Sequence, residues 1–465
     1  MVETIEQTGL TVPAVEELSA RHGEPEWLLR RRLEAWRLFE EAPMPDPLSE
    51  EWKRIDTTKL TLDGLLPSAP ASGASALDER EALAGFVAQQ DSGIARAQLD
   101  ASLAQRGVIV TDLHRAAREH EAVVREHLGS LVTDAEWKYL SLHGALWSGG
   151  CLVYVPAGVE VELPVEYLVE VATARLAVFP HLLIVAEADS KVTVIQEQLS
   201  RNKEQGTRNK ATPPREYGNL VSGAVEAVVR DGAQVRFVDV QRWGPNVQNF
   251  VTMRATLGRG SSFQAILLGL GGSLTRARLD VLLAEESARA DLLGLFYGDG
   301  GERFVYDTRQ DHIAPRTESD LLFKAALDGH AGFVWDGVVD VRSTASQAAA
   351  NQTSRNLLLS DTASASPTPI LEISAYDVLR CSHGATVGPV DDEQLFYLQS
   401  RGIPAEEAER MLVDGFFNEV LERVPSEPLR RRVAQVLAEK RNQEPGTRNE
   451  ARNAEPGTQN LEPRT

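Results

Sequence analysis

Cysteine is nearly absent from this sequence. The 465 residues contain two, Cys151 and Cys381. Two thiols so far apart do not form a disulfide framework, and this scarcity is typical of a protein from a reducing compartment such as the cytoplasm. The same shortage excludes a cluster or zinc site made from thiolates of this chain alone, because such sites usually take four protein ligands, mostly sulfur.

Long apolar runs and a leader pattern are missing as well. The sequence has no run of roughly 18 or more apolar residues, the length that a membrane-spanning helix requires. Its start, Met-Val-Glu-Thr-Ile-Glu, lacks the basic and then apolar order of a signal peptide. We therefore expect a cytoplasmic protein with no membrane partner.

Positive charge is in short supply. The chain carries 48 Lys and Arg against 68 Asp and Glu, a net charge of −20. A surface this acidic repels phosphate backbones, so nucleic acid is not an expected partner. The sequence also lacks a GxxxxGK[ST] phosphate loop, so we do not expect this chain to hydrolyse ATP itself.

A period of two dominates the middle of the chain, from about residue 146 to 378, and predicts short strands, among them 159–163. Turn pairs interrupt it at 189–190, 231–232, 259–260 and 286–287, at intervals of 42, 28 and 27 residues. The first interval contains the polar stretch 202–215, without which it also measures 28. This recurrence predicts the coils of a β-solenoid, with a β-sandwich of evenly spaced hairpins as the alternative.

Helical spacing of apolar residues marks both ends of the chain. In the first part it predicts helices over 27–41, about 78–105 and 116–128, and the basic triplet Arg30-Arg31-Arg32 is expected on a solvated face. After residue 390 it predicts helices over 391–401, from 403 to about 424, and over 429–440. The segments 202–215 and 441–465 have almost no apolar content and are predicted to be disordered.

The candidate chemistry lies in Arg380-Cys381-Ser382-His383-Gly384. In an extended segment, residues two apart point to the same face, so the Cys381 thiol and the His383 imidazole would be neighbours, a pair suited to iron, zinc or sulfur chemistry. The alternative is an inert thiol beside a hydrogen-bonded histidine. Glu372 and Asp377 flank the motif and are candidates to supply oxygen ligands or to orient His383. For Cys151 a packed core position is favoured, and for His312 a role in turn architecture.

The stretch 351–424 contains Asn351-Gln352-Thr353-Ser354-Arg355-Asn356, Leu371-Glu372-Ile373, Cys381-Ser382-His383-Gly384-Ala385-Thr386 and Leu395-Phe396-Tyr397-Leu398. With these motifs it resembles the SufB/SufD family, the scaffold subunits of the Suf iron–sulfur cluster assembly machinery. Weaker similarity reaches back to Gly23-Glu24-Pro25-Glu26-Trp27.

The family fold agrees with the solenoid prediction. It implies a mainly β protein with a central right-handed parallel β-helix and helical segments at both ends. We expect an N-terminal helical region over 1–130, a β-helix core over 131–380 that includes the disordered insert 202–215, a C-terminal helical region that docks an ATPase over 381–440, and a disordered tail over 441–465.

The resemblance also implies a function. It suggests a SufD-like scaffold subunit, not an enzyme, that pairs with a SufB-like subunit and a SufC-like ABC ATPase. Cys381 and His383 would help to receive iron and sulfide, and a transient iron–sulfur cluster would form at the subunit interface. The ATPase would dock on the apolar stripe formed by Leu412, Phe416, Phe417 and Val420. The family also associates a flavin with the assembled complex, although no flavin motif is present here.

Three alternatives remain open at this point. The shortage of thiols favours the SufD type, but a SufB-like scaffold acting as a homodimer is the runner-up. A solenoid enzyme is a further alternative, either a polysaccharide lyase, which is generally secreted, or an acyltransferase, which needs a six-residue repeat. A purely structural solenoid without metal chemistry is the last.

Overall fold

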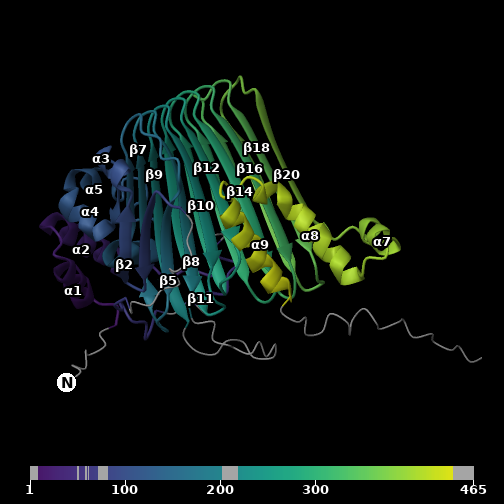
Figure 1. Cartoon of the computed structure of the whole chain (residues 1–465), viewed down its shortest axis with the longest axis horizontal. Helices are drawn as coiled ribbons and strands as arrows, with labels where there is room; N and C mark the ends of the chain where they lie inside the picture. The colour runs from purple at the N-terminus through teal and green to yellow at the C-terminus, as the bar shows by residue number, and fades with distance from the viewer. Residues whose placement is uncertain are drawn as a thin grey trace, which may run out of the picture.

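A computed structural model of the chain describes residues 9–49, 52–57, 60, 62–71, 82–201 and 218–442. The predicted disordered insert at 202–215 lies outside these residues, as does the predicted tail 441–465 from residue 443 onward. Residues 441 and 442, the first two of that tail, belong to a helix instead. The alternating segments form a parallel β-solenoid, and the prediction of a mainly β fold with helices at both ends is confirmed (Figure 1).

Two ten-stranded sheets face each other across the solenoid interior. One sheet has the order β2 (Gly93–Leu99), β1 (Gly85–Gln90), β5 (Val165–Val171), β8 (Lys191–Ser200), β10 (Gln234–Arg242), β12 (Ser262–Gly269), β14 (Arg289–Gly298), β16 (Glu318–Leu327), β18 (Ala349–Leu358) and β20 (Arg380–Pro389). The other has the order β19 (Ser364–Ile373), β17 (Gly332–Val341), β15 (Arg303–His312), β13 (Leu274–Leu283), β11 (Val247–Leu257), β9 (Asn219–Val229), β7 (His181–Ala186), β4 (Cys151–Val155) and β3 (Ile109–Asp112), with β6 (Ala177–Val178) beside β9. Inward-facing apolar residues of both sheets form one continuous core.

A column of turn residues with positive φ follows one corner of the solenoid. It consists of Asp189, Gly232, Gly260, Ser287, Arg316 and Gln347, with φ between 57° and 67°. Each donates its backbone N–H to a carbonyl of the next coil, as from Gly232 to Arg259 (2.8 Å) and from Gln347 to Asp377 (3.0 Å). The turn pairs recognised in the sequence therefore mark one corner of successive coils.

The N-terminal helices gather at one end of the solenoid (Figure 1). They are α1 (Val12–His22), α2 (Glu26–Glu41), α3 (Ala101–Gln105), α4 (Leu113–Glu119), α5 (Glu121–His127) and α6 (Lys138–Leu146). The predicted helix at 27–41 is confirmed as α2, and the one predicted at 116–128 is divided between α4 and α5 at His120.

Two predictions for this half of the chain are wrong. The segment 85–99, predicted as helix, forms β1 and β2, because β1 is buried over its whole length against β5 of the solenoid. Tertiary pairing overrides the local preference there. The segment 159–163 contains a single isolated bridge at Glu160 instead of a strand.

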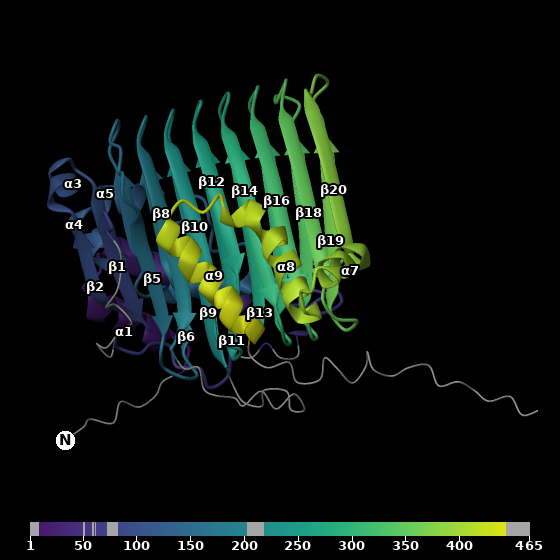
Figure 2. The ribbon, with the colours of Figure 1, turned by 45° about the vertical axis from the view of Figure 1, so that its right-hand side comes forward.

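The C-terminal helices are α7 (Asp392–Ser400), α8 (Ala405–Leu421) and α9 (Glu427–Asn442), close to the predicted bounds. In Figure 2, α8 and α9 lie across the outer face of the sheet that contains β8 to β20, and α7 stands at the end of the solenoid. Within the described part of the chain, no helix is long and apolar enough to span a bilayer.

Apolar residues on the outer face of that sheet explain why α8 and α9 bind there. Outward-facing side chains in the middle of the strands form a patch with one side of both helices. This patch includes Ile195, Val238, Val240, Ile266, Leu268, Leu293, Leu295, Val413, Phe417, Val420, Leu429, Val433 and Leu437. Near the start of the same strands, outward positions such as Thr193, Arg236 and Asp320 are polar. The helices therefore cover the apolar part of the sheet and leave the polar part bare.

Candidate functional site

The last coil of the solenoid, formed by β19 and β20, is the place where the Cys-x-His motif lies. β20 ends one sheet and β19 ends the other, and among the described residues no further strand pairs with either (Figure 2). Their outer edges present backbone N–H and C=O groups that a strand of another chain could pair with. The coil is therefore an open end, unlike the other end, where helices gather.

Cys381 and His383 both face the solenoid interior. Cys381 is in register with Ala350 of β18 and His383 with Gln352, and both of these residues are fully buried inward-facing positions. Because no described coil follows, the inward side of β20 is open, so His383 is exposed and Cys381 is half-buried beside Leu371 and Val378. The prediction that β20 is extended, with the two side chains on one face, is confirmed.

The environment of Cys381 keeps its thiol protonated. Burial raises the pKa of this thiol, although a hydrogen bond with the backbone of Ala350 acts in the opposite direction. The thiolate is the nucleophile and the metal ligand. The thiol of the isolated chain is thus poorly activated, and a change in its surroundings is needed to make it reactive.

The structure does not bring Glu372 or Asp377 to this pair. Glu372 faces outward on β19, in register with Asp340, and its carboxylate lies 3.9 Å from the guanidinium of Arg309. Asp377 is exposed at the corner between β19 and β20, where its backbone carbonyl accepts the N–H of Gln347. Within the described residues, no group of three or more His, Cys, Asp or Glu side chains could hold a metal ion. A ligand set at Cys381 and His383 therefore needs donors from elsewhere.

Cys151 and His312 occupy structural positions. Cys151 lies in β4, fully buried in the solenoid core, and burial raises the pKa of its thiol far above the usual range. This confirms the predicted core position. His312, at the end of β15, is fully buried, and its two ring nitrogens lie 2.8 Å from the hydroxyls of Thr317 and Ser319.

The predicted docking stripe on α8 is largely covered by this chain itself. Phe417 and Val420 are fully buried in the apolar patch on the sheet, whereas Leu412 and Phe416 are half-buried. The Lys324 ammonium, on β16, donates to the Phe416 carbonyl oxygen (2.8 Å) and pairs with the Glu419 carboxylate (2.6 Å). The expectation that this stripe awaits a partner does not fit Phe417 and Val420.

The apolar surface that does remain exposed in this region lies on α7 and on the first half of α8. Phe396 is 72% exposed, Tyr397 is 56% exposed and Met411 is 47% exposed. No residue of α7 is buried. Sequence periodicity could not separate these residues from the covered stripe, because both sets are apolar and lie on helices.

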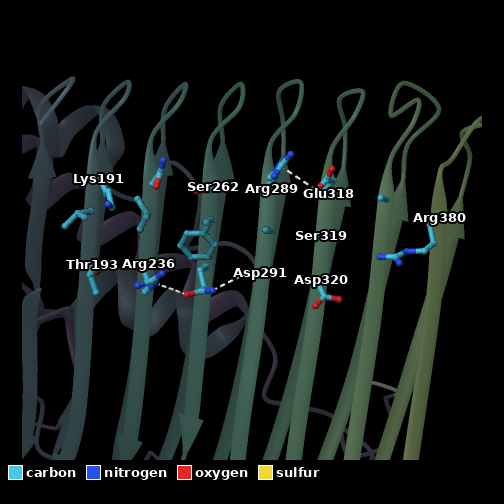
Figure 3. Close-up of a pocket in the computed structure, with 17 residues that line it drawn as sticks. Lys191, Thr193, Arg236, Ser262, Arg289, Asp291, Glu318, Ser319, Asp320 and Arg380 are labelled. Atoms are coloured by element: carbon cyan, nitrogen blue, oxygen red, sulfur yellow. Dashed lines mark hydrogen bonds and ion pairs between the residues drawn. The ribbon is translucent and has the colours of Figure 1, made fainter. Parts of the chain in front are cut away.

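A polar groove of about 590 Å³ crosses the bare part of the outer sheet face (Figure 3). Its floor carries Arg236, Arg289, Asp291, Glu318 and Asp320, and it ends at Arg380, next to Cys381. Side chains of both charges pair across it, as between Arg289 and Glu318 (3.6 Å). The groove is thus a mutually neutralised surface and not a concentration of charge of one sign.

Comparisons with known proteins agree with this architecture. The profile of the family described as "SUF system FeS cluster assembly, SufBD core domain" matches residues 169–416, more than half of the chain, and that of the "SufBD protein N-terminal region" matches residues 86–167. Similar proteins include iron–sulfur cluster assembly SufBD family proteins of Staphylococcus epidermidis and Staphylococcus haemolyticus. Each is 29% identical over 444 residues, which cover 90% of this chain and 91% of the relative.

Proposed function

Since this chain belongs to the SufBD family of iron–sulfur cluster assembly proteins, we propose that it is a SufD-type scaffold subunit of a Suf complex. Iron and sulfide are its cargo. The chain acts in the cytoplasm and does not itself hydrolyse ATP. The observation that carries the proposal is the open coil β19–β20, which presents a thiol and an imidazole on one inward-facing side.

The open coil supports pairing with a second scaffold subunit. Cys381 and His383 offer two ligands, fewer than a cluster takes, so the missing ligands come from a SufB-like subunit docked on this end or from sulfide. The same docking would bury Cys381 further and change its neighbours. Burial alone would raise the pKa of this thiol further, so a positive charge or a metal ion that arrives with the partner is needed to form the thiolate.

Thiol scarcity supports the SufD type over the SufB type. A SufB-like homodimer would place two copies of the same pair at the interface, which gives two thiols and two imidazoles. In a SufD-type heterodimer, the additional thiols would come from the other subunit. Sedimentation of the purified chain alone, and of the chain co-expressed with its neighbouring subunits, separates the two assignments. A stable homodimer that builds clusters unaided would contradict the SufD assignment.

Exposed residues of α7 and α8 support docking of a SufC-like ABC ATPase at this end. Phe396, Tyr397 and Met411 offer the exposed apolar side chains, and the half-buried Leu412 and Phe416 lie on the same helix as Met411. Because α8 packs on β14 and β16, a force on these helices acts on the sheet itself. Flavin association with the assembled complex stays a prediction.

The test is cluster assembly by the reconstituted complex. We expect His383→Ala and Cys381→Ser chains to fold, pair with the SufB-like subunit and bind the ATPase, yet to build little or no cluster when iron and sulfide are supplied anaerobically, as followed by visible absorption. Cys151→Ser serves as the matched thiol control and should assemble clusters normally. If the His383→Ala complex assembles clusters at the wild-type rate, the assignment of this site is wrong.

A further inference from the structure

A directional chain of hydrogen bonds runs inside the solenoid toward the open coil. It starts at Thr317, whose hydroxyl donates its single hydrogen to the Ala314 carbonyl oxygen (3.0 Å). The Thr317 oxygen must then accept from Nδ1 of His312 (2.8 Å). His312 is neutral, because burial lowers its pKa to about 4, so its Nε2 accepts the hydroxyl hydrogen of Ser319 (2.8 Å).

The direction of each later bond follows from the first. The Ser319 hydroxyl donates its only hydrogen to His312, so its oxygen accepts a hydrogen bond from Nε2 of Gln310 (2.6 Å). The oxygen of Gln310 in turn accepts from Nε2 of Gln352 (2.9 Å). The orientation of both side-chain amides is therefore fixed.

The chain of bonds ends on an acceptor that has no donor. The Gln352 side chain is fully buried, and within the described residues its Oε1 has no hydrogen-bond partner. A buried orphan acceptor costs on the order of 1–3 kcal/mol. Because Nε2 bonds to Gln310, on β15 of an earlier coil, the oxygen is the atom of this amide that remains for a donor from the open coil.

The residue in register with Gln352 on that coil is His383. Neighbouring strands of a sheet lie about 4.8 Å apart, and both side chains face inward, so the His383 side chain is the neighbour of the Gln352 amide on the open coil. Imidazoles that ligate metals generally donate their second N–H to an oxygen, which fixes the tautomer and the ring orientation.

We propose that Gln352 is a positioning residue for His383: its side-chain oxygen accepts one imidazole N–H and leaves the lone pair of the other nitrogen directed out of the open coil. The inference rests on the proposed role of His383 in iron handling. It assigns the buried amides of Gln310 and Gln352, which the Cys-x-His motif alone does not reveal, to the same site.

Nuclear magnetic resonance of the full chain labelled with ¹⁵N-histidine tests the hydrogen bond directly. His383→Ala identifies the His383 signals. We expect one fixed tautomer in the wild type and a mixture in Gln352→Leu. Gln196→Leu is the matched control, because Gln196 on β8 is also buried with an unpartnered Oε1 but lies far from the open coil, and it should leave the His383 signals unchanged.

Ser319→Ala provides a second variant in case Gln352→Leu fails to fold. It removes the acceptor of Gln310 and so releases the orientation of both amides, which should also produce a tautomer mixture at His383. If the His383 signals of Gln352→Leu, or of Ser319→Ala where the former does not fold, match the wild type, the proposal is overturned.

Anaerobic titration with ferrous ion separates this inference from the proposed function. Gln352→Leu should bind the ion about 10–100-fold more weakly than the wild type, whereas Gln196→Leu should bind it equally well. If His383→Ala and Cys381→Ser bind ferrous ion as the wild type does, the iron-handling role of this site fails, and the tautomer measurement still decides whether Gln352 positions His383.

Discussion

At the scale of single residues, the solenoid interior holds a carboxyl group in an unfavourable place. Asp239 on β10 faces inward and is buried, with one hydrogen bond from the Gln198 amide nitrogen (2.6 Å). Burial raises the pKa of Asp239 from its usual value to about 7, although the bond from Gln198 opposes this. The carboxyl is therefore partly protonated near neutral pH, and its ionised form weakens the fold.

Asp239→Asn should remove a pH dependence of stability. The folded pKa lies above the unfolded one, so the folded state binds the proton more tightly, and the stability gained from it is present in acid and lost as pH rises through about 7. Relative to the wild type, the stability gain of Asp239→Asn should grow from about pH 4 to about pH 7 and stay constant above that, at roughly 4 kcal/mol. Urea unfolding at several pH values measures this, and parallel curves for the two chains would refute it.

The basic triplet on α2 shows how neighbouring residues of one type can differ. Arg30 is exposed and pairs with Glu26 one turn away, whereas Arg32 is fully buried, bonded to both oxygens of Glu24 (2.6 and 2.8 Å) and stacked on the ring of Trp147. The expectation of a solvated face is therefore wrong for Arg32. Its partners come from the preceding loop and from the residue after α6, which local periodicity does not indicate.

Glu24→Gln should destabilise the chain by about 3–5 kcal/mol, because it leaves the Arg32 charge buried without its counter-ion. Glu26→Gln is the control: it removes an exposed pair with Arg30 and should change the unfolding midpoint little. Chemical unfolding of both variants provides the comparison. Equal midpoints would mean that the buried pair contributes no more than the exposed one.

At the scale of elements, the α8–α9 hairpin is bound to the sheet by apolar contacts and by charge pairs at both ends. Lys324 lies under α8, and the Lys440 ammonium, near the end of α9, contacts the Leu270 carbonyl oxygen (3.0 Å) and the Glu302 carboxylate (3.1 Å). The two helices are therefore part of the folded body of the molecule, and only their outer surfaces and α7 remain for partners.

Phe417→Asp and Met411→Asp should have different effects, although both residues lie on α8. Phe417→Asp buries a charge in the apolar patch, at a cost of several kcal/mol, and should release the hairpin, seen as faster proteolysis at residues 422–426. Met411→Asp should keep the wild-type melting temperature and weaken only ATPase co-purification. Full ATPase binding by Met411→Asp would place the docking surface elsewhere.

The sequence predicted the solenoid because its turn residues repeat and its strands alternate, and both are local properties. It failed at 85–99, where a segment with helix-forming residues is recruited as a strand by β5. It also could not show that the stripe on α8 is covered, since α8 packs on β14 and β16, which lie far away along the chain.

The site was predictable only within one strand. A period of two places Cys381 and His383 on the same face of β20, but it does not extend across the corner to β19, so the outward direction of Glu372 was not foreseen. Gln352 was missed for a similar reason. It belongs to the preceding coil, and only strand register connects it with His383.

At the scale of the whole molecule, the two ends differ. One end is covered by the N-terminal helices and stabilised by the buried Arg32–Glu24 pair, and the other ends in a coil with an exposed inner side. Exposed apolar side chains at this second end, including Leu379, Tyr376 and Phe396, add to the surface available there. Exposed apolar side chains gathered in one place are typical of a surface that binds another protein.

The α8–α9 hairpin crosses several successive coils of the stack, from β8 to β16. A coil in this span cannot open without also breaking contacts with a helix, whereas the β19–β20 coil can detach alone. Backbone amides should therefore exchange with deuterium soonest in β19 and β20 and much later in β10 to β14, although every strand belongs to the same two sheets. Binding of a second scaffold subunit should slow exchange in that last coil specifically, which makes the exchange rate of its amides a direct measure of assembly.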